Sequence, residues 1–281
     1  IGQVVDKASF LSYLRNLSKK NKNIDVIDNT ELDIKQLESL SKIYLPNESE
    51  AIDFGQLIVT DGANSKFAEK LNIPYKNINY DQTSYIFNGE YDSMEKSTAQ
   101  IFTDKGVFAV LPGHGNKKSI VATVHNKFID DFKFESNTIN ENLLERQLLP
   151  YVKNLKNLKL IYKHPLNTVR LDNWFFKQTL FLGNSSQLLH PFGAQGFNFA
   201  LDCIKKLDTQ WEYLSSNDKS TEHVINNITK KRNELFNGID LTSSLLLKNN
   251  ILAAISSSFI AKTLNLSNTI KNFFIKRILN I

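Results

Sequence analysis

The sequence predicts an α/β fold that also contains an antiparallel β-sheet and a helical C-terminal region. An apolar run of strand length at residues 179–182 leads through a polar turn and a loop rich in Pro and Gly into a helical pattern. Residues 72–170 instead show the alternation of apolar and polar side chains that is typical of half-buried strands. The apolar residues of the helical pattern recur at helical spacing: Phe197, Ala200, Leu201, Ile204 and Leu207.

Composition limits the class of protein. A chain of 281 residues with 41% hydrophobic residues can bury one large core or two modest cores. Cys203 is the single cysteine, so no internal disulfide can form and a cytoplasmic location is expected. The net charge is +5, but the basic residues are scattered, which favours a weak preference for anionic membrane surfaces and no nucleic-acid partner. No apolar run approaches the roughly 18–20 residues that span a bilayer, so no transmembrane segment is expected.

The first elements are expected to be a helix and two strands. Asp6 is a candidate N-cap for an amphipathic helix that reaches residue 20. Residues 24–27 predict a short strand. The continuous apolar run at residues 57–60 predicts a buried strand, which leads into the turn dipeptide Asp61-Gly62.

The middle and the end of the chain are expected to hold a sheet followed by helices. Residues 118–125 alternate after a turn at residues 113–115, so that Ile120, Ala122 and Val124 share one face and Val121, Thr123 and His125 the other. A helix is predicted at residues 140–152 and a strand at residues 160–164. The aromatic patch at residues 171–176 is interpreted as core packing, with contact to a quinone ring as the alternative. A later helical stripe consists of Val224, Ile228, Leu235, Ile239, Thr242 and Leu246.

The loop after residue 182 has the features of a ligand-binding loop. Gly193, Ala194 and Gly196 leave its backbone largely uncovered, so the first free N–H groups of the following helix can point at an electron-rich group. An anion or a ring carbonyl fits such a site.

This loop resembles the flavin-binding loop of the FAD-dependent aromatic hydroxylases of ubiquinone biosynthesis, G-D-A-A-H-x-x-x-P-x-x-G-Q-G-x-N. Residues 183–187, Gly-Asn-Ser-Ser-Gln, stand where G-D-A-A-H is expected, and His190-Pro191 precedes Gln195-Gly196-Phe197-Asn198. The Asn and Gln variants are similar to the 2-octaprenyl-6-methoxyphenol hydroxylases (UbiH type). The Asp61-Gly62 turn, with Ser65, resembles the A-D-G-x-x-S signature of the same family.

The resemblance implies a partial, Rossmann-like FAD-binding domain at residues 1–71 and 171–208, an antiparallel-sheet substrate domain at residues 72–170 and a helical region at residues 209–281. No G-x-G-x-x-G is present in the sequence, so the resemblance covers about the last two thirds of a family member. It implies NAD(P)H as the reductant, and it implies these FAD-binding residues: Asp61, Gly62, Asn184, Pro191, Gly193, Ala194, Gln195, Gly196, Phe197 and Asn198.

The function implied is that of a monooxygenase. Reduced FAD reacts with oxygen, and the resulting C4a-hydroperoxide hydroxylates a polyprenylated phenol. The alternative, which the missing G-x-G-x-x-G favours, is a non-catalytic remnant or partner subunit of the same fold that has lost FAD binding. Other ubiquinone-biosynthesis proteins are further expected partners. The terminal segment 270–281 carries apolar residues beside three cations, which fits either core packing or a peripheral contact with the inner face of the membrane.

Side-chain catalysis has no candidate in the sequence. The five histidines do not have the spacing of a metal-binding helix, no G-x-S-x-G is present, and Cys203 is not on a glycine-rich turn. His190 is interpreted as a residue that stabilises the loop rather than as a catalytic group, because the flavin itself supplies the difficult chemistry.

Overall fold

The computed structural model describes residues 5–30, 42–45, 51–93, 98–112, 118–136, 139–191, 195–211 and 219–247. The chain divides into two compact units, which we name the sheet unit (Ile1–Asn29 with Tyr80–Leu166) and the loop unit (Thr30–Asn79 with Asn167–Ile281). Two long strands, β4 (Tyr75–Ser93) and β8 (Val152–Leu171), run from one unit into the other. None of the described helices is long and apolar enough to cross a membrane.

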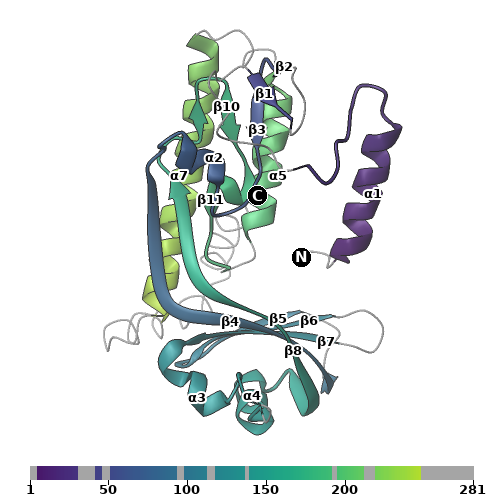
Figure 1. Ribbon diagram of the computed structural model, residues 1–281. Coiled ribbons are helices and arrows are strands. Elements are labelled where there is room, and N and C mark those ends of the chain that lie inside the picture. Colours follow the sequence, from purple (N-terminus) through teal and green to yellow (C-terminus); the bar gives the residue numbers. More distant parts are fainter. Residues whose placement is uncertain are drawn as a thin grey trace. The chain divides into compact units, whose positions relative to one another are not determined.

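A six-stranded sheet is the largest element of the fold (Figure 1), and its strand order is β11-β8-β4-β7-β6-β5. The strands β4, β7, β6 and β5 pair antiparallel in turn, as β11 does with β8, which confirms the predicted antiparallel sheet. The predicted strand at residues 160–164 is part of the much longer β8. The remaining strands are β5 (Ala99–Phe102), β6 (Gly106–Pro112), β7 (Lys118–His125) and β11 (Gln187–Leu188).

The core of the sheet unit is built from aromatic side chains on one face of the sheet. Tyr85 and Phe87 of β4 lie opposite Ala122 and Ile120 of β7, and all four are fully buried. This face is covered by η2 (Asn126–Phe128), α3 (Ile129–Phe132) and α4 (Glu141–Leu148), whose places are visible in Figure 1. Ile120, Ala122 and Val124 are each 0% exposed, so the predicted inward face of residues 118–125 is confirmed.

The opposite face of β7 is less exposed than its polar residues suggest. Thr123 is 3% exposed, and its hydroxyl lies 3.0 Å from the hydroxyl of Ser84 across the β4–β7 pair. Asn88 of β4 likewise accepts a 2.9 Å hydrogen bond from Ser119 of β7. Cross-strand hydrogen bonds of this kind let polar residues line a partly covered sheet face. The predicted turn at residues 113–115 lies outside the described residues.

The strand β8 breaks the regular alternation of buried and exposed residues twice. The sequence Lys-Asn-Leu-Lys-Asn-Leu-Lys at residues 153–159 places Asn154 and Asn157 in the left-handed region, with φ of 55° and 56°. The backbone N–H groups of the following leucines, Leu155 and Leu158, donate to Glu145 and Glu141 of α4 at 2.7 and 3.1 Å. The two glutamates therefore satisfy strand N–H groups that do not pair within the sheet.

The predicted helix at residues 140–152 is shorter than expected. Asn140 caps its start by accepting from the N–H of Leu143 at 3.1 Å, and α4 ends at Leu148. Leu149 is extended, with ψ of 143°, because it precedes Pro150, and the residue before a proline avoids the helical region.

The loop unit contains a small three-stranded sheet with the order β3-β10-β9. The middle strand β10 pairs parallel with β3 and antiparallel with β9, and a separate antiparallel pair joins β1 to β2. The apolar core of this unit includes Leu180 and Phe181 of β10, both 0% exposed, and Trp174, 3% exposed. Its elements are β1 (Lys42–Tyr44), β2 (Ala51–Asp53), β3 (Leu57–Val59), α2 (Lys66–Lys70), β9 (Phe175–Phe176), β10 (Thr179–Phe181), η3 (Gly183–Ser185), α5 (Gln195–Asp208) and α7 (Lys219–Leu247).

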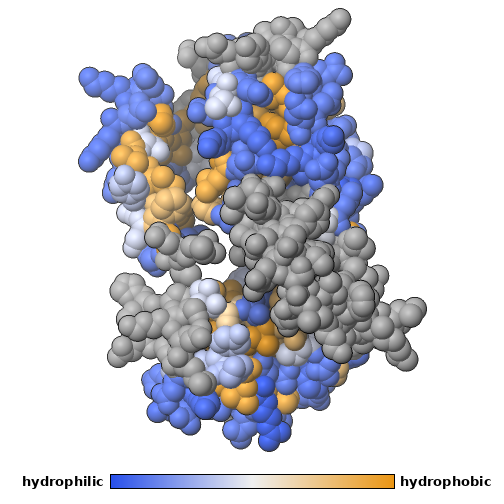
Figure 2. Space-filling view, turned by 180° about the vertical axis from the view of Figure 1, so that it is seen from behind, coloured by the Kyte–Doolittle hydropathy of each residue, from blue (hydrophilic) through white to orange (hydrophobic). Residues whose placement is uncertain are grey.

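The first helix forms as predicted, but its apolar stripe is not buried. The helix α1 spans Lys7–Lys20, and the carboxylate of Asp6 accepts from the N–H of Ser9 at 2.8 Å. It has no buried residue, and Figure 2 shows hydrophobic side chains at its surface. The predicted strand at residues 24–27 is wrong: these residues are not in a strand and pair with no strand of the described structure, and Ile24 and Ile27 are 44% and 55% exposed.

The face that α5 buries agrees with the predicted stripe at Leu207 but not at Phe197, Leu201 and Ile204. Phe199, Cys203 and Leu207 point into the core and are 3–6% exposed, whereas Phe197, Leu201 and Ile204 are 47–61% exposed. The helix is apolar on two sides, so helical spacing alone does not tell which side packs against the sheet. In α7, Val224 and Ile228 are buried as predicted, and the other four side chains of that stripe lie outside the described ones, as does segment 270–281.

The two sides of α5 can be compared by the same substitution on one helix. We expect Leu207→Ala to lower the free energy of unfolding by about 2–5 kcal/mol, because it removes a buried leucine from the core. Leu201→Ala should change it by less than about 0.5 kcal/mol, as is usual at the surface. Urea unfolding followed by circular dichroism measures both values. A larger loss for Leu201→Ala would contradict the observed orientation of the helix.

Candidate cofactor site

Two turns that lie far apart in the sequence meet at one edge of the small sheet. Leu57 pairs with Thr179 and Val59 pairs with Phe181, in parallel register, so β3 and β10 end side by side. The N–H of Leu182 continues the pairing by donating to the carbonyl of Val59 at 3.0 Å. The chain segments that follow parallel strands emerge at the same edge, which is where open α/β sheets bind ligands. The Asp61-Gly62 turn and the turn at Gly183–Ser185 therefore lie together, within the loop unit.

The first turn orients its aspartate through the start of α2. Asp61 Oδ2 accepts from the hydroxyl of Ser65 at 3.0 Å, and Ser65 Oγ in turn accepts from the N–H of Ala68 at 3.1 Å as the N-cap of α2. Gly62 has φ of +97°, a conformation that side chains rarely adopt. The turn therefore offers the Asp61 carboxylate, oriented by Ser65 through one of its oxygens, beside the backbone of Gly62, which carries no side chain of its own.

The second turn is fastened to the end of β3. The Ser185 hydroxyl lies 2.7 Å from the carbonyl oxygens of both Val59 and Leu182, and Ser186 Oγ donates to Gly183 O at 3.0 Å. Gly183 has φ of +62°, so the turn requires a residue that tolerates the left-handed region. Asn184, the residue predicted to reach the cofactor, is exposed at the tip of this turn.

The rest of the predicted loop is only partly described. His190 is 2% exposed and Pro191 is exposed. Gln195 and Gly196 begin α5, and Phe197 and Asn198 in its first turn are exposed, with Phe197 61% exposed. Gly193, Ala194 and the side chain of Gln195 lie outside the described part of the structure.

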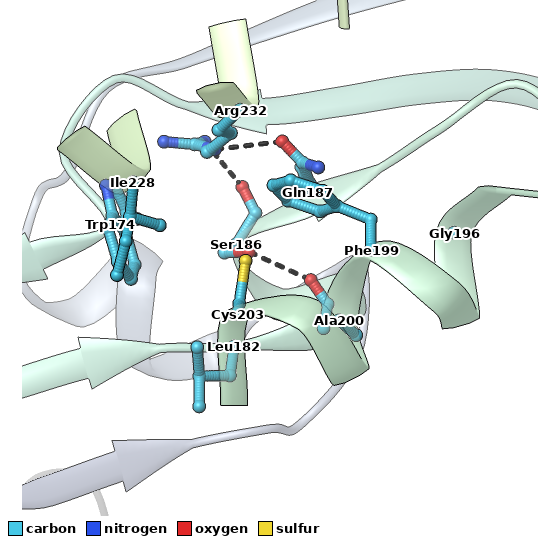
Figure 3. Close-up of a pocket in the computed structure, with 11 residues that line it drawn as sticks. Trp174, Leu182, Ser186, Gln187, Gly196, Phe199, Ala200, Cys203, Ile228 and Arg232 are labelled. Carbon is cyan, nitrogen blue, oxygen red and sulfur yellow. Dashed lines mark hydrogen bonds between the residues drawn. The ribbon is translucent and has the colours of Figure 1, made fainter. Parts of the chain in front are cut away.

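A buried arginine, which the sequence did not indicate, lies behind the second turn (Figure 3). Arg232 of α7 is 2% exposed. Its Nε donates to Gln187 Oε1 at 2.9 Å, and its Nη2 donates to the carbonyl oxygens of Leu171 and Ser186 at 2.6 and 2.9 Å. One side chain therefore connects α7 with the end of β8 and with the loop segment. The available signal was its position four residues after Ile228, within the buried stripe of α7.

The described residues leave the charge of Arg232 without a directly bound group of opposite sign. Among the described residues, no carboxylate forms a salt bridge with it, and its three acceptors are neutral oxygens. Burial, together with the nearby Arg170, lowers the pKa of Arg232 to about 10, so the guanidinium remains charged at neutral pH.

Arg232 borders a small pocket between the loop, α5 and α7. Figure 3 shows Trp174, Gln187 and Cys203 around it, and it reaches Gly183 at the start of the loop and Gly196 at its end. Burial raises the pKa of the Cys203 thiol to about 11, so this cysteine is not a nucleophile at neutral pH. Gln187 Nε2 is buried and has no hydrogen-bond partner in the described part of the chain. No group of three His, Cys, Asp or Glu side chains there could hold a metal ion.

The residues of this edge fit a flat cofactor such as FAD. Ideal Cβ atoms built on Gly62, Gly183 and Gly196 have no heavy atom of the described residues within 4 Å, so the backbone at all three is open to close approach. Asn184 offers an exposed amide beside Gly183, and the N-terminal end of α5, which begins at Gln195, is the kind of helix start that favours electron-rich groups.

Comparison with known proteins shows similarity to flavin enzymes and to a ubiquinone hydroxylase. No protein-family model matches the chain. The chain is 22% identical over 146 residues to a ubiquinone hydroxylase, UbiL, of Rhodospirillum rubrum; the match covers 52% of this chain and 34% of that protein. The chain therefore matches about a third of the length of this relative.

Solved structures of flavin enzymes share the fold over most of this chain. The flavin-dependent brominase Bmp2 matches with a TM-score of 0.73 and 10% identity over 98% of this chain and 70% of its own. PqsL of Pseudomonas aeruginosa, in complex with 2-aminobenzoylacetate, matches with a TM-score of 0.68 and 14% identity over 89% of this chain and 72% of its own. The protein thus has a mixed α/β fold of the flavin-dependent monooxygenase type, with distant sequence similarity to a ubiquinone hydroxylase.

The different conformations of two loop glycines predict opposite effects of the same substitution. Gly183→Ala should lower the free energy of unfolding by about 1 kcal/mol or more, because alanine is strained at positive φ. Gly196→Ala should leave it unchanged or slightly raised, since Gly196 is helical and a Cβ there has open space. Thermal unfolding of the two variants checks the difference; equal losses would show that the turn conformation at Gly183 is misassigned.

Proposed function

We propose that this protein is an FAD-dependent monooxygenase that hydroxylates a polyprenylated phenol in ubiquinone biosynthesis, with NAD(P)H as the reductant. The observation that carries the proposal is the meeting of the Asp61-Gly62 and Gly183-Asn184 turns at the ends of two parallel strands. Parallel strand ends with open glycines are suited to a nucleotide cofactor. The fold shared with flavin enzymes and the distant similarity to UbiL support the same assignment.

The roles of the residues are those of binding and orientation. When bound, FAD supplies the oxygen chemistry. The exposed side chain of Asn184 and the carboxylate of Asp61 are hydrogen-bonding groups for the sugar-like and phosphate-proximal parts of the cofactor. The N–H groups at the start of α5 are donors for an electron-rich ring edge, where they stabilise negative charge. Gly62, Gly183 and Gly196 permit close approach, because no Cβ lies in the way.

The substrate class is proposed from the relative rather than from the pocket. UbiL is a ubiquinone hydroxylase, and ubiquinone precursors carry a long apolar tail that dissolves in lipid. An enzyme with such a substrate meets it at a membrane surface. We therefore propose a peripheral contact with the membrane, for which segment 270–281 is the candidate; its structure lies outside the described residues.

Gly196 allows a direct test of cofactor binding, because an added Cβ meets no atom of the other described residues within 4 Å. In protein expressed from the complete gene, we expect the wild type to purify with FAD and Gly196→Val to lose it, with an unchanged circular dichroism spectrum. The β-branched side chain blocks the approach of the cofactor to the helix start. Asn184→Asp, which introduces the commoner residue of the resembling family, is the matched variant that should retain FAD. Flavin content follows from absorbance after denaturation.

Two other results would decide against parts of the proposal. If the wild type contains and binds no FAD, the protein is the non-catalytic alternative of the same fold. If FAD is bound equally by wild type and Gly196→Val, the loop is structural and the cofactor lies elsewhere.

The substrate class is tested separately from the cofactor. Wild-type protein with bound FAD should oxidise NAD(P)H with formation of hydroxylated product when it is given a polyprenylated phenol in detergent micelles. Simple phenols without a tail should give NAD(P)H oxidation at least about tenfold slower, because remote apolar binding energy contributes to turnover. Product identity is determined by mass spectrometry. Equal rates with and without the tail would remove the polyprenylated substrate class and leave the flavin assignment in place.

A further inference from the structure

The hydrogen bonds of the buried Arg232 explain how its side chain is held, but they do not explain why this side chain carries a charge. Its three acceptors, Leu171 O, Ser186 O and Gln187 Oε1, hold the guanidinium in place. A neutral donor of similar shape would make comparable bonds. Arg232 is 2% exposed and has no carboxylate partner among the described residues, and burying an ionised group in this way costs free energy unless another negative charge is nearby in the functional state.

The surroundings of Arg232 add positive charge rather than remove it. Arg170 stacks on Phe236, with its guanidinium carbon 4.5 Å from the ring centroid, and it acts on Arg232 as a like charge. Asp172 acts on Arg232 as an opposite charge, but no salt bridge joins the two side chains in the described structure. Gln187 Nε2 is one more buried donor for which the described residues provide no acceptor. This part of the loop unit therefore carries an excess of positive charge and of hydrogen-bond donors.

The position of Arg232 connects this excess to the cofactor loop. Its side chain lines the same small pocket as Gly183 and Gly196, the glycines at the two ends of the loop (Figure 3). Two of its three acceptors, Ser186 O and Gln187 Oε1, belong to the loop itself. In a buried region of low dielectric, the charge of Arg232 acts strongly on groups bound near this loop.

We propose that Arg232 is a positioning residue that also gives the loop a fixed positive charge, and that this charge favours the anionic, reduced form of the flavin ring over the neutral, oxidised form. The inference rests on the proposed function, because it concerns the same cofactor. It assigns a redox-tuning role to a side chain of α7, beyond the backbone N–H groups of the loop.

The change Gln187→Glu separates the charge of Arg232 from its hydrogen bonds. Glutamate has the same shape, and its Oε1 can still accept from Nε of Arg232, but it neutralises the guanidinium locally. We expect the dissociation constant for reduced FAD, divided by that for oxidised FAD, to rise about tenfold, the effect of one charge acting through partly buried protein. The phosphates and the sugar are the same in both forms, so their contributions cancel in the ratio. Anaerobic titrations with oxidised and dithionite-reduced FAD measure it.

The matched control replaces an amide by a carboxylate beside Arg170 instead of beside Arg232. Asn233 Oδ1 accepts from Arg170 Nη1 at 3.3 Å, so Asn233→Asp adds a negative charge next to a guanidinium that does not line the pocket. We expect this variant to change the ratio less than about threefold, because neither Asn233 nor Arg170 lines the pocket that Arg232 borders. The midpoint potential of the bound flavin should fall in Gln187→Glu and stay near the wild-type value in Asn233→Asp.

The outcomes are distinguishable. Equal weakening of both redox forms in Gln187→Glu, or an equal shift in the control, overturns the charge role and leaves Arg232 as a structural connector. If Gln187→Glu does not fold, Arg232→Lys and Arg232→Met replace it: lysine keeps the charge and should keep the ratio, whereas methionine should raise it about tenfold. Wild-type protein that binds neither form of FAD removes the proposed function and this inference with it.

Discussion

Three parallel residue pairs between β3 and β10 determine where the rest of the loop unit can act. They bring the ends of two strands that are about 120 positions apart to one edge, and Ser185 then fastens the second turn to the carbonyl of Val59. The left-handed conformations at Gly62 and Gly183, the start of α5 and the buried arginine of α7 all serve this edge. Without the pairing, the two motifs would be unrelated turns.

Local features were predictable from the sequence because short-range interactions determine them. The Asp6 cap, the Asp-Gly turn and the alternation around Ile120 each depend on neighbours a few residues away. The buried face of α5 was not predictable in the same way. Its two apolar sides have the same helical spacing, and only the packing of Phe199 and Cys203 against distant residues selects one. The prediction of a strand at residues 24–27 was wrong because a strand needs a partner strand, and the pattern of apolar residues in one segment does not show whether a partner exists.

The sequence anticipated the proposed cofactor site only at the residues of the two turns and the loop. A resemblance in residues 183–198 identifies the loop, but the side chain that supports it from behind comes from α7, 45 residues after Gln187. An arginine in an apolar stripe has two explanations, a solvent-reaching side chain or a buried one with acceptors, and the sequence does not distinguish them. The carbonyl groups of Leu171 and Ser186 that make burial tolerable belong to the backbone, which carries no sequence signature.

The repeated Lys-Asn-Leu triplets of β8 have a consequence for how this protein behaves in a crowded cell. In the described sheet, β11 covers β8 only at Val169 and Arg170, so a long stretch of β8 borders no further strand. An uncovered strand is a template on which a second molecule can add its own strand. The two left-handed asparagines interrupt the flat hydrogen-bonding edge, Glu141 and Glu145 occupy N–H groups that an incoming strand would need, and the exposed lysines repel a like-charged copy. Irregular backbone, occupied N–H groups and exposed lysines are features by which natural sheets discourage pairing between exposed edges.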